Sequence, residues 1–382
     1  MSKFMTKMRR SGIVLVLFSL LIAGPDVLAT SVQSSPQEFA QSSAYQAYRA
    51  LLQKAVLPAG PAERTFNHAD VSDINSRIKE NTRPSSYDGS RFLYEAFVKY
   101  PELKTELAAL REAMAQLGSQ NGFNNLPTDE QLAYWLNLHN LLVIEQIASL
   151  YPVKILQDLY SGPAAIIDKP LVSVAGQSLS LNAIKTSKIL PLAGRRPEVI
   201  YGLYEGYISG PSIRNEPFTG QNLHAALQQN AVEFVNTSRG TYAGQNEFRA
   251  SGFYQRQQAF FPDYPFDLKP HLQKYLTGAE LKTLTAVNEV STNLDDWHVT
   301  DLYGTVRASN DRGLDAEYAT EGLVRETTAP GVSKGVKLSR RQQEQILKIK
   351  LRQQPKEGRV DIQDLPAEKV VSADKAGTDS GQ

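Results

Sequence analysis

Residues 131–150, QLAYWLNLHNLLVIEQIASL, form a segment of helix length whose apolar side chains fall on nearly every face. A helix that is apolar all round is normally buried. This one also carries Asn137, His139 and Asn140, and an amide buried without a partner costs about 1–3 kcal/mol. We therefore expect these polar groups to bond specific partners, which either lock the fold or line a binding site.

Apolar residues at helical spacing predict further helices on both sides of this central one. Thr128 or Asp129 is expected to cap the central helix, since either side chain can accept a hydrogen bond from its first turn. Pro101 suits the start of a helix. The other predicted helices cover residues 44–56, 71–79, 90–100, 102–117, 181–190, 223–236, 266–276 and 278–288.

Short β-like runs are fewer than the helical segments. They cover residues 164–167, 171–174 and 198–204, and the second run leads into a turn at 175–177. Many helices with few short strands predict a helix-rich α+β fold. We expect one large domain with a small sheet and a central buried helix.

The first 29 residues have the pattern of a secretory signal peptide. Four basic residues precede an apolar run of 12 residues, 12–23. That run is shorter than the roughly 20 residues that span a membrane. Val27, Leu28 and Ala29 suit signal peptidase, so we expect cleavage after Ala29 and a periplasmic or secreted protein. An uncleaved anchor is the alternative.

The rest of the chain divides by composition into a spacer, a domain and a tail. Residues 30–40 are a polar spacer, and residues 41–326 form the predicted domain. Residues 327–382 are basic and of low complexity, and we expect them to be disordered. The stretch 334–359 carries nine Lys or Arg residues. It is either a solvated tail or a weak contact with a membrane surface or an envelope polymer.

Charge and cysteine content restrict the chemistry. The formal net charge is +1, and it becomes −2 without residues 1–29, so we expect no nucleic-acid partner. The chain has no Cys, which excludes disulfides, thiolate metal sites and thiol nucleophiles. Residues 295–301 hold one dense group of acids with His298, but a single His is a poor metal signature. We predict no metal and no cofactor, and a loop whose Trp297 packs on the core.

Three blocks of the sequence resemble the DUF547 family of bacterial envelope proteins. They are AYWLNLHN at 133–140, LSLNAIKTSKIL at 179–190 and PEVIYGLYEGYISGPSIRNEPFTGQNL at 197–223. The resemblance extends over about residues 85–265. The biochemistry of this family is largely unassigned, so the resemblance implies an exported protein more than it implies a reaction.

The chain departs from the family at one position. Many members have a Cys immediately before the proline of the glycine-rich turn, and the corresponding residue here is Gly210, ahead of Pro211. In those members the resemblance suggests a thiol nucleophile, as in papain or transglutaminase folds. Ser209 and Ser212 flank the position, but a serine needs an activating base within hydrogen-bond reach. The catalytic residues are therefore unknown.

The candidate site combines the central helix with this turn. Asn137 and Asn140 are three residues apart and share a helix face. Arg214 follows the turn and would suit a carboxylate or phosphate, unless it pairs with Glu216 or Glu205. The turn glycines either serve backbone geometry or expose amides to an anion. The candidate binding residues are Trp135, Asn137, Asn140, Gly206, Ser209, Gly210, Pro211 and Arg214.

Two functions remain open from the sequence. The first is a non-catalytic binding or scaffold protein with an anion-compatible cleft, whose partner is an envelope ligand or protein. The alternative is a hydrolase or acyl-transferase of papain- or transglutaminase-like ancestry that uses a mechanism without Cys. A base within about 3 Å of Ser209 or Ser212 would favour the enzyme.

Overall fold

The computed structural model describes residues 35–58, 89–162 and 165–302. The predicted signal peptide (1–29), the predicted helix at 71–79 and the tail (327–382) lie outside these residues.

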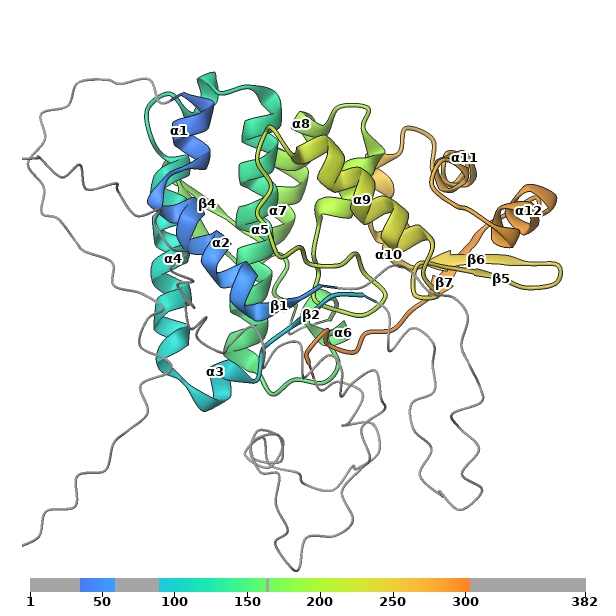
Figure 1. Cartoon of the computed structure of the whole chain (residues 1–382), viewed down its shortest axis with the longest axis horizontal. Helices are drawn as coiled ribbons and strands as arrows, with labels where there is room; N and C mark the ends of the chain where they lie inside the picture. The colour runs from blue at the N-terminus through green and yellow to red at the C-terminus, as the bar shows by residue number, and fades with distance from the viewer. Residues whose placement is uncertain (1–34, 59–88, 163–164, 303–382) are drawn as a thin grey trace, which may run out of the picture.

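Helix α5 (Thr128–Leu150) occupies the centre of the fold, as the sequence predicts. Its side chains are buried almost along its whole length. Helix α4 (Glu102–Gly118) runs beside it, and α2 (Ser43–Ala55) packs against α4 (Figure 1). The predicted cap is wrong: the helix begins at Thr128 after Pro127, and no side chain caps it. Pro127 fixes the entry of the chain instead.

Helix α1 (Pro36–Ala40) lies within the segment expected to be a spacer. Ser35 caps it and forms a capping box with Glu38. Phe39 is buried against the rings of Tyr45 and Phe123. This single aromatic residue attaches the helix to the packed body of the protein.

The strands of the described ranges form three small sheets. β1 (Val56–Leu57) pairs with β2 (Arg91–Phe92), and β3 (Val172–Val174) forms an antiparallel hairpin with β4 (Gln177–Leu179). In the third sheet, β5 (Thr241–Ala243) is antiparallel to β6 (Phe248–Ser251), which is parallel to β7 (Ser291–Leu294). The predicted helix-rich α+β class is confirmed.

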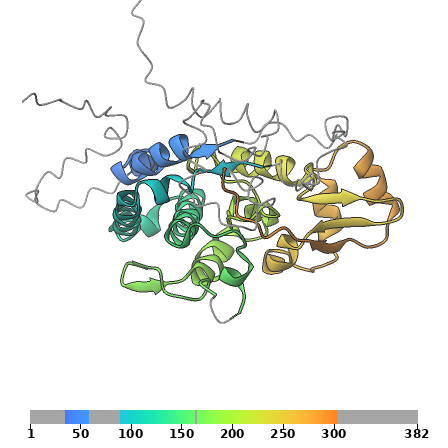
Figure 2. The same ribbon diagram turned by 90° about the horizontal axis from the view of Figure 1, so that it is seen from below.

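The remaining helices are short, except α9. The third sheet lies with α11 and α12 at the opposite end of the molecule from α1, α2 and α4 (Figures 1 and 2). The helices are α3 (Ala96–Lys99), η3 (Phe123–Asn125), α6 (Gln157–Tyr160), α7 (Leu181–Ile184), η4 (Lys185–Ile189), α8 (Leu190–Ala193), η5 (Pro197–Gly202), α9 (Leu223–Val235), α10 (Phe253–Arg256), η6 (Gln258–Phe260), α11 (Leu268–Gln273) and α12 (Ala279–Ala286).

Three further predictions of local structure are wrong. The run 198–204 is not a strand, because residues 197–202 form the 3-10 helix η5. A short apolar run that is buried on all sides does not distinguish strand from helix by periodicity. Residues 90–100 divide into β2 and the single turn α3. Of the run 164–167, residues 165–167 are described and contain no strand.

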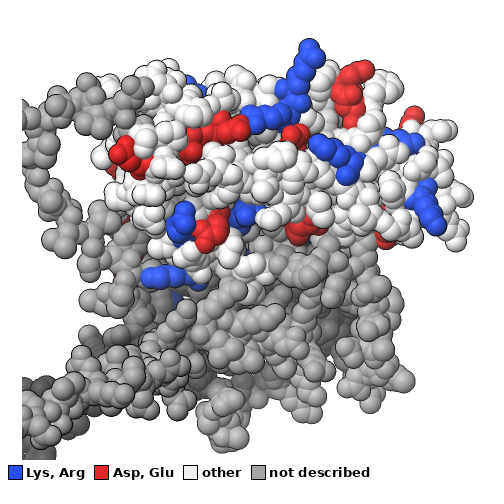
Figure 3. Space-filling model, turned by 45° about the horizontal axis from the view of Figure 1, so that its top comes forward, with Lys and Arg blue, Asp and Glu red and all other residues white. Residues whose placement is uncertain are grey.

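The surface in Figure 3 mixes both signs of charge. Lys and Arg side chains alternate with Asp and Glu over the coloured part of this face, without one large patch of either sign. Within the described ranges, no helix is both long enough and apolar enough to cross a membrane.

Candidate functional site

The central asparagines of α5 hold two separate backbone segments. Asn137 donates to the carbonyl of Phe218 (2.7 Å) and accepts from the N–H of the same residue (2.9 Å). Asn140 donates to the carbonyl of Gly202 (2.9 Å) and accepts from the N–H of Tyr204 (2.9 Å). Both amides are buried and use their nitrogen and oxygen on backbone groups. They therefore fasten the 202–218 region to the central helix.

His139 lies on a different side of α5 and is also buried. Burial lowers its pKa to about 4, which makes the ring neutral at physiological pH. Its Nδ1 lies 3.3 Å from Oδ1 of Asn140. The ring thus belongs to the interior of the fold.

The turn over residues 206–212 depends on a glycine at its start. Gly206 has φ +80°, and an added Cβ would lie 2.1 Å from Cδ1 of Ile147. The carbonyl of Gly206 accepts from the N–H (2.8 Å) and the hydroxyl (2.9 Å) of Thr300. Glycine is therefore required here both for the backbone conformation and for the close contact with α5.

The hydroxyls of the turn are bonded to structural partners. Oγ of Ser209 donates to the carbonyl of Asp296 (3.2 Å) and accepts from its N–H (3.0 Å). Oγ of Ser212 accepts from the N–H of Ser90 (2.9 Å) and from Arg239 (2.9 Å). In the part of the chain that the structure describes, no histidine ring or carboxylate bonds either Oγ.

A histidine–aspartate pair lies beside this turn. Nδ1 of His298 is 2.7 Å from Oδ1 of Asp296, whose carboxylate is buried while the His298 ring is 33% exposed. The backbone joins the pair to the turn, because Ile208 donates to the carbonyl of His298 (2.9 Å) and Ser209 to that of Asp296 (3.1 Å). No described residue bonds Nε2 of His298.

Sequence reasoning treated this acidic segment as a packing loop, and half of that interpretation is confirmed. Trp297 packs on the core and lies against Tyr207 (ring centroids 4.6 Å apart). The hydrogen-bonded pair of His298 and Asp296 was not predicted. The spacing of an acid two residues before a histidine was the available signal, but its meaning depends on the distant turn at 206–212.

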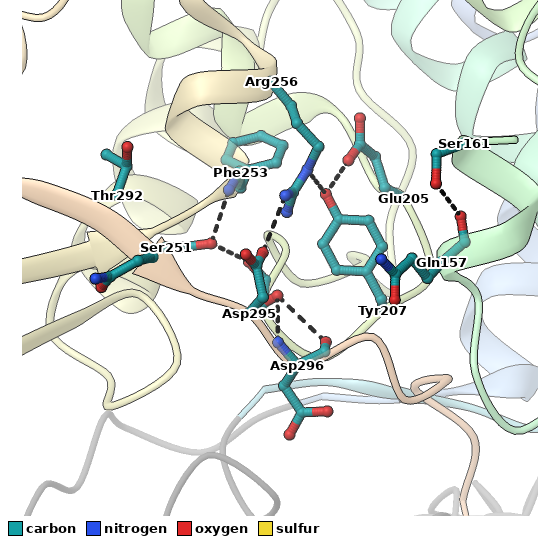
Figure 4. Close-up of polar contacts among 12 residues, drawn as sticks. Gln157, Ser161, Glu205, Tyr207, Ser251, Phe253, Arg256, Thr292, Asp295 and Asp296 are labelled. Carbon is teal, nitrogen blue, oxygen red and sulfur yellow. Dashed lines mark hydrogen bonds and ion pairs between the residues drawn. The ribbon is translucent and has the colours of Figure 1, made fainter.

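A buried polar cluster supports the same turn from the other side. Tyr207 donates to the carboxylate of Glu205, and Nε of Arg256 donates to the Tyr207 hydroxyl (3.1 Å; Figure 4). Burial raises the pKa of Tyr207 well above its usual value, and the charge of Glu205 raises it further. Arg256 also pairs with Asp295 (2.9 Å) and lies 4.4 Å from the centre of the Trp297 ring. The phenol is therefore held protonated and the arginine held in place.

Arg214 lies against helix α9 and has neutral acceptors. Its Nη1 donates to Asn230 (3.2 Å), to Gln229 (3.3 Å) and to the carbonyl of Ala226 (3.4 Å). Glu216, one of the two alternative ion-pair partners considered, instead lies 3.6 Å from Arg49. Burial lowers the pKa of Arg214, and Glu216 partly offsets this effect. No carboxylate among the described residues lies within ion-pair distance of Arg214.

Trp135 lies apart from the other candidate residues. It lines a cavity of about 460 Å³, together with residues from α4, η3, the β3–β4 hairpin, η4 and α8. None of the other seven candidate residues lines this cavity. The structure thus brings Gly206, Ser209, Gly210 and Pro211 together with the loop 295–301, and places Trp135 elsewhere.

A metal site does not emerge from the described residues. No group of three His, Asp or Glu side chains among them is placed to hold a metal ion.

Comparison with known proteins gives one match. Residues 123–235 match the family model described as "Protein of unknown function, DUF547". These residues include α5, η5 and the 206–212 turn, and so most of the candidate site. No curated protein and no solved structure matches the chain. The match supports a DUF547-like segment at residues 123–235, and the family model carries no assigned biochemical role.

Proposed function

We propose that the protein is exported and binds an anionic ligand of the cell envelope without forming a covalent intermediate. One observation carries the proposal. The His298–Asp296 pair lies beside a turn in which Gly210 takes the position where the resemblance to DUF547 members implies a Cys. The arrangement fits a thiol site that retains its histidine and acid and lacks its nucleophile.

The hydroxyls next to Gly210 do not replace the thiol. Ser209 and Ser212 bond backbone and arginine groups, so neither has a base to remove its proton. This supports binding over acyl transfer.

Arg214 supports an anionic ligand. Its guanidinium is partly buried, it bonds only neutral oxygens of the described residues, and its charge has no ion-pair partner among them. A carboxylate or phosphate would supply the missing negative charge and two further acceptors. Export is supported by the predicted signal peptide at 1–29.

The test restores the missing thiol and compares it with the natural chain. Gly210 has no positive φ, and an added Cβ would lie 3.2 Å from the Tyr207 ring, so Gly210→Cys requires only a small shift. With p-nitrophenyl acetate, we expect no rapid burst of p-nitrophenol release from the natural chain. From Gly210→Cys we expect a burst of about one p-nitrophenol per protein molecule. The matched controls are Gly210→Ala and the double variant Gly210→Cys with His298→Ala, and neither should give a burst.

Two results would contradict the proposal. A burst from the natural chain, or fluorophosphonate labelling of Ser209 or Ser212, would show a working nucleophile. Equal thiol reactivity with and without the His298 ring would remove the histidine from the site. The binding of an anion is tested separately, by calorimetric titration with phosphate. Arg214→Ala should lose binding. Arg196→Ala, which removes a partly exposed arginine paired with Asp129, should retain it.

A second candidate function rests on the same histidine. Nε2 of His298 has no bond to any described residue, and Asp296 holds the opposite nitrogen. Such a ring could take a proton from water and direct the hydroxide at an ester. Hydrolysis that proceeds without a burst and disappears in His298→Ala would favour this hydrolase.

A further inference from the structure

The cavity beside Trp135 is separate from the 206–212 turn. It opens between the C-terminal end of α4 and the first two turns of α5, and the β3–β4 hairpin and the segment η4 complete it. Its volume of about 460 Å³ lies within the range of small-molecule sites. None of its lining residues belongs to the turn or to the loop 295–301.

Carboxamides dominate the polar lining of this cavity. Five of them contribute, and the described residues that line the cavity include no Asp or Glu. A carboxamide offers donors and an acceptor side by side, which matches the hydroxyl groups of a sugar, since each hydroxyl both donates and accepts. The five are Gln120, Asn121, Asn124, Gln131 and Gln177.

Among the described residues that line the cavity, Lys188 is the one cation. Nζ of Lys188 lies 2.6 Å from Oε1 of Gln177 and 5.5 Å from the centre of the Trp135 ring. No carboxylate of the described residues is within ion-pair distance of it. Lys188 belongs to η4, a single π-helical turn, and such turns occur frequently at functional sites.

Trp135 provides a second, independent observation. Its side chain lines the cavity although the residue is only 5% exposed. No described residue accepts a hydrogen bond from its indole N–H, and this nitrogen is not among the fully buried unbonded atoms, so a small molecule can reach it. The donor is therefore available to a molecule in the cavity.

We propose that this cavity binds a saccharide that carries a carboxylate, such as a uronic acid unit. Lys188 pairs with the carboxylate, and the carboxamides bond the sugar hydroxyls. The indole N–H of Trp135 donates to a further sugar oxygen. The apolar residues Phe123, Val174 and Leu192 contact the C–H face of the ring.

The experiment uses the two tryptophans of the full chain. Trp297→Phe leaves Trp135 as the sole indole emitter and keeps an aromatic ring against Tyr207. Trigalacturonic acid is titrated into this variant, with its methyl ester as the uncharged probe and triglutamate as an acidic peptide with a similar charge. Calorimetry on the chain without the substitution checks that Trp297→Phe has not altered the site.

We expect saturable quenching by trigalacturonic acid. The methyl ester should bind about 10-fold or more weakly, because it loses one charge-assisted hydrogen bond. Lys188→Gln should remove that difference, and Arg214→Ala should leave it unchanged. The Arg214→Ala variant distinguishes this proposal from the proposed function, because anion binding in the proposed function depends on Arg214.

Three outcomes would overturn the proposal. Equal affinity for the acid and its ester in the chain with Lys188 would remove the cation from recognition. Binding of triglutamate at the same strength would indicate an acidic peptide instead of a sugar. No saturation by either sugar would show that the cavity does not bind this class of molecule.

Discussion

The first turns of helix α5 and its middle contain a similar mixture of aromatic, apolar and amide side chains, but their amides have different surroundings. In the middle, Asn137 and Asn140 use both nitrogen and oxygen on backbone groups. Near the start, Gln131 donates to Leu126 and Asn124, but no described residue bonds its oxygen. Trp135 beside it also has an unused N–H. One end of the helix faces a cavity, and the middle secures the fold.

The amides of the two regions differ in burial as well as in bonding. Asn137 and Asn140 are buried, whereas Gln131 is only partly buried. Burial and the number of partners together decide whether a substitution affects folding or binding. The predictions that follow test this distinction.

The largest effect is expected for Asn140→Leu. The change leaves the carbonyl of Gly202 and the N–H of Tyr204 buried without a partner, at roughly 1–3 kcal/mol each. Chemical denaturation should show a loss of about 4 kcal/mol in the free energy of unfolding. Gln131→Leu is the control and should cost under about 1.5 kcal/mol, because its two acceptors lie near the surface. Similar losses for both variants would contradict the distinction.

Gly206→Ala should be the next most destabilising change. A Cβ there meets Ile147 of α5 at 2.1 Å, and φ of +80° is strained for alanine. Strain and overpacking together suggest a loss of about 3 kcal/mol. Gly210→Ala, in the same turn, has ordinary φ and a nearest contact of 3.2 Å. Thermal unfolding of the two variants should differ clearly, and equal melting temperatures would refute the close contact.

These cases also show how far the sequence could predict the structure. The apolar pattern of 131–150 predicts a buried helix, and burial predicts that Asn137 and Asn140 need partners. The sequence does not reveal which groups these partners are, because Phe218, for example, lies 81 residues from Asn137 in the chain. The helix η5 was mistaken for a strand, since burial on all sides removes the periodicity that distinguishes the two.

The candidate site shows the same limit. The turn residues Gly206 to Pro211 could be selected from the sequence, because glycine and proline spacing is a local signal. The His298–Asp296 pair could not be assigned to that turn. Its relation to Ser209 depends on hydrogen bonds between segments 87 residues apart. Arg214 was selected only because it follows the turn, and its neutral partners on α9 could not be predicted because they depend on the folded helix.

A pH series extends the comparison to a buried ring. Burial, together with a smaller effect of the Lys274 charge, lowers the pKa of His271 to about 3. The unfolded ring titrates near 6.5, so between pH 6.5 and 3 the unfolded chain binds one more proton. Stability from this residue is complete above pH 6.5 and falls as the pH drops toward 3. His271→Phe keeps an aromatic ring stacked on Tyr201 and removes the imidazole group that titrates.

The expected result is a flatter pH profile. Between pH 6 and 4, the slope of the unfolding free energy should decrease by up to about 1.4 kcal/mol per pH unit in His271→Phe. Denaturant titrations at several pH values measure this slope. His224→Gln, which removes an exposed histidine, serves as the matched control. An unchanged slope in His271→Phe would mean that the ring is not held neutral in the folded protein.

The smallest effect on stability is expected for Lys188→Gln, at the cavity end of α5. The change removes a cation–π contact with Trp135 at 5.5 Å, which is worth about 0.5–1 kcal/mol at a partly exposed site. Glutamine can still bond Gln177 through its own amide, so the net loss should be under about 1 kcal/mol. Thermal unfolding of the variant and of Asn140→Leu under the same conditions measures the contrast. A loss as large as that of Asn140→Leu would place Lys188 among the residues that secure the fold. A small loss would show that Lys188 contributes little to folding stability. This is expected of a lysine whose role is to bind a ligand.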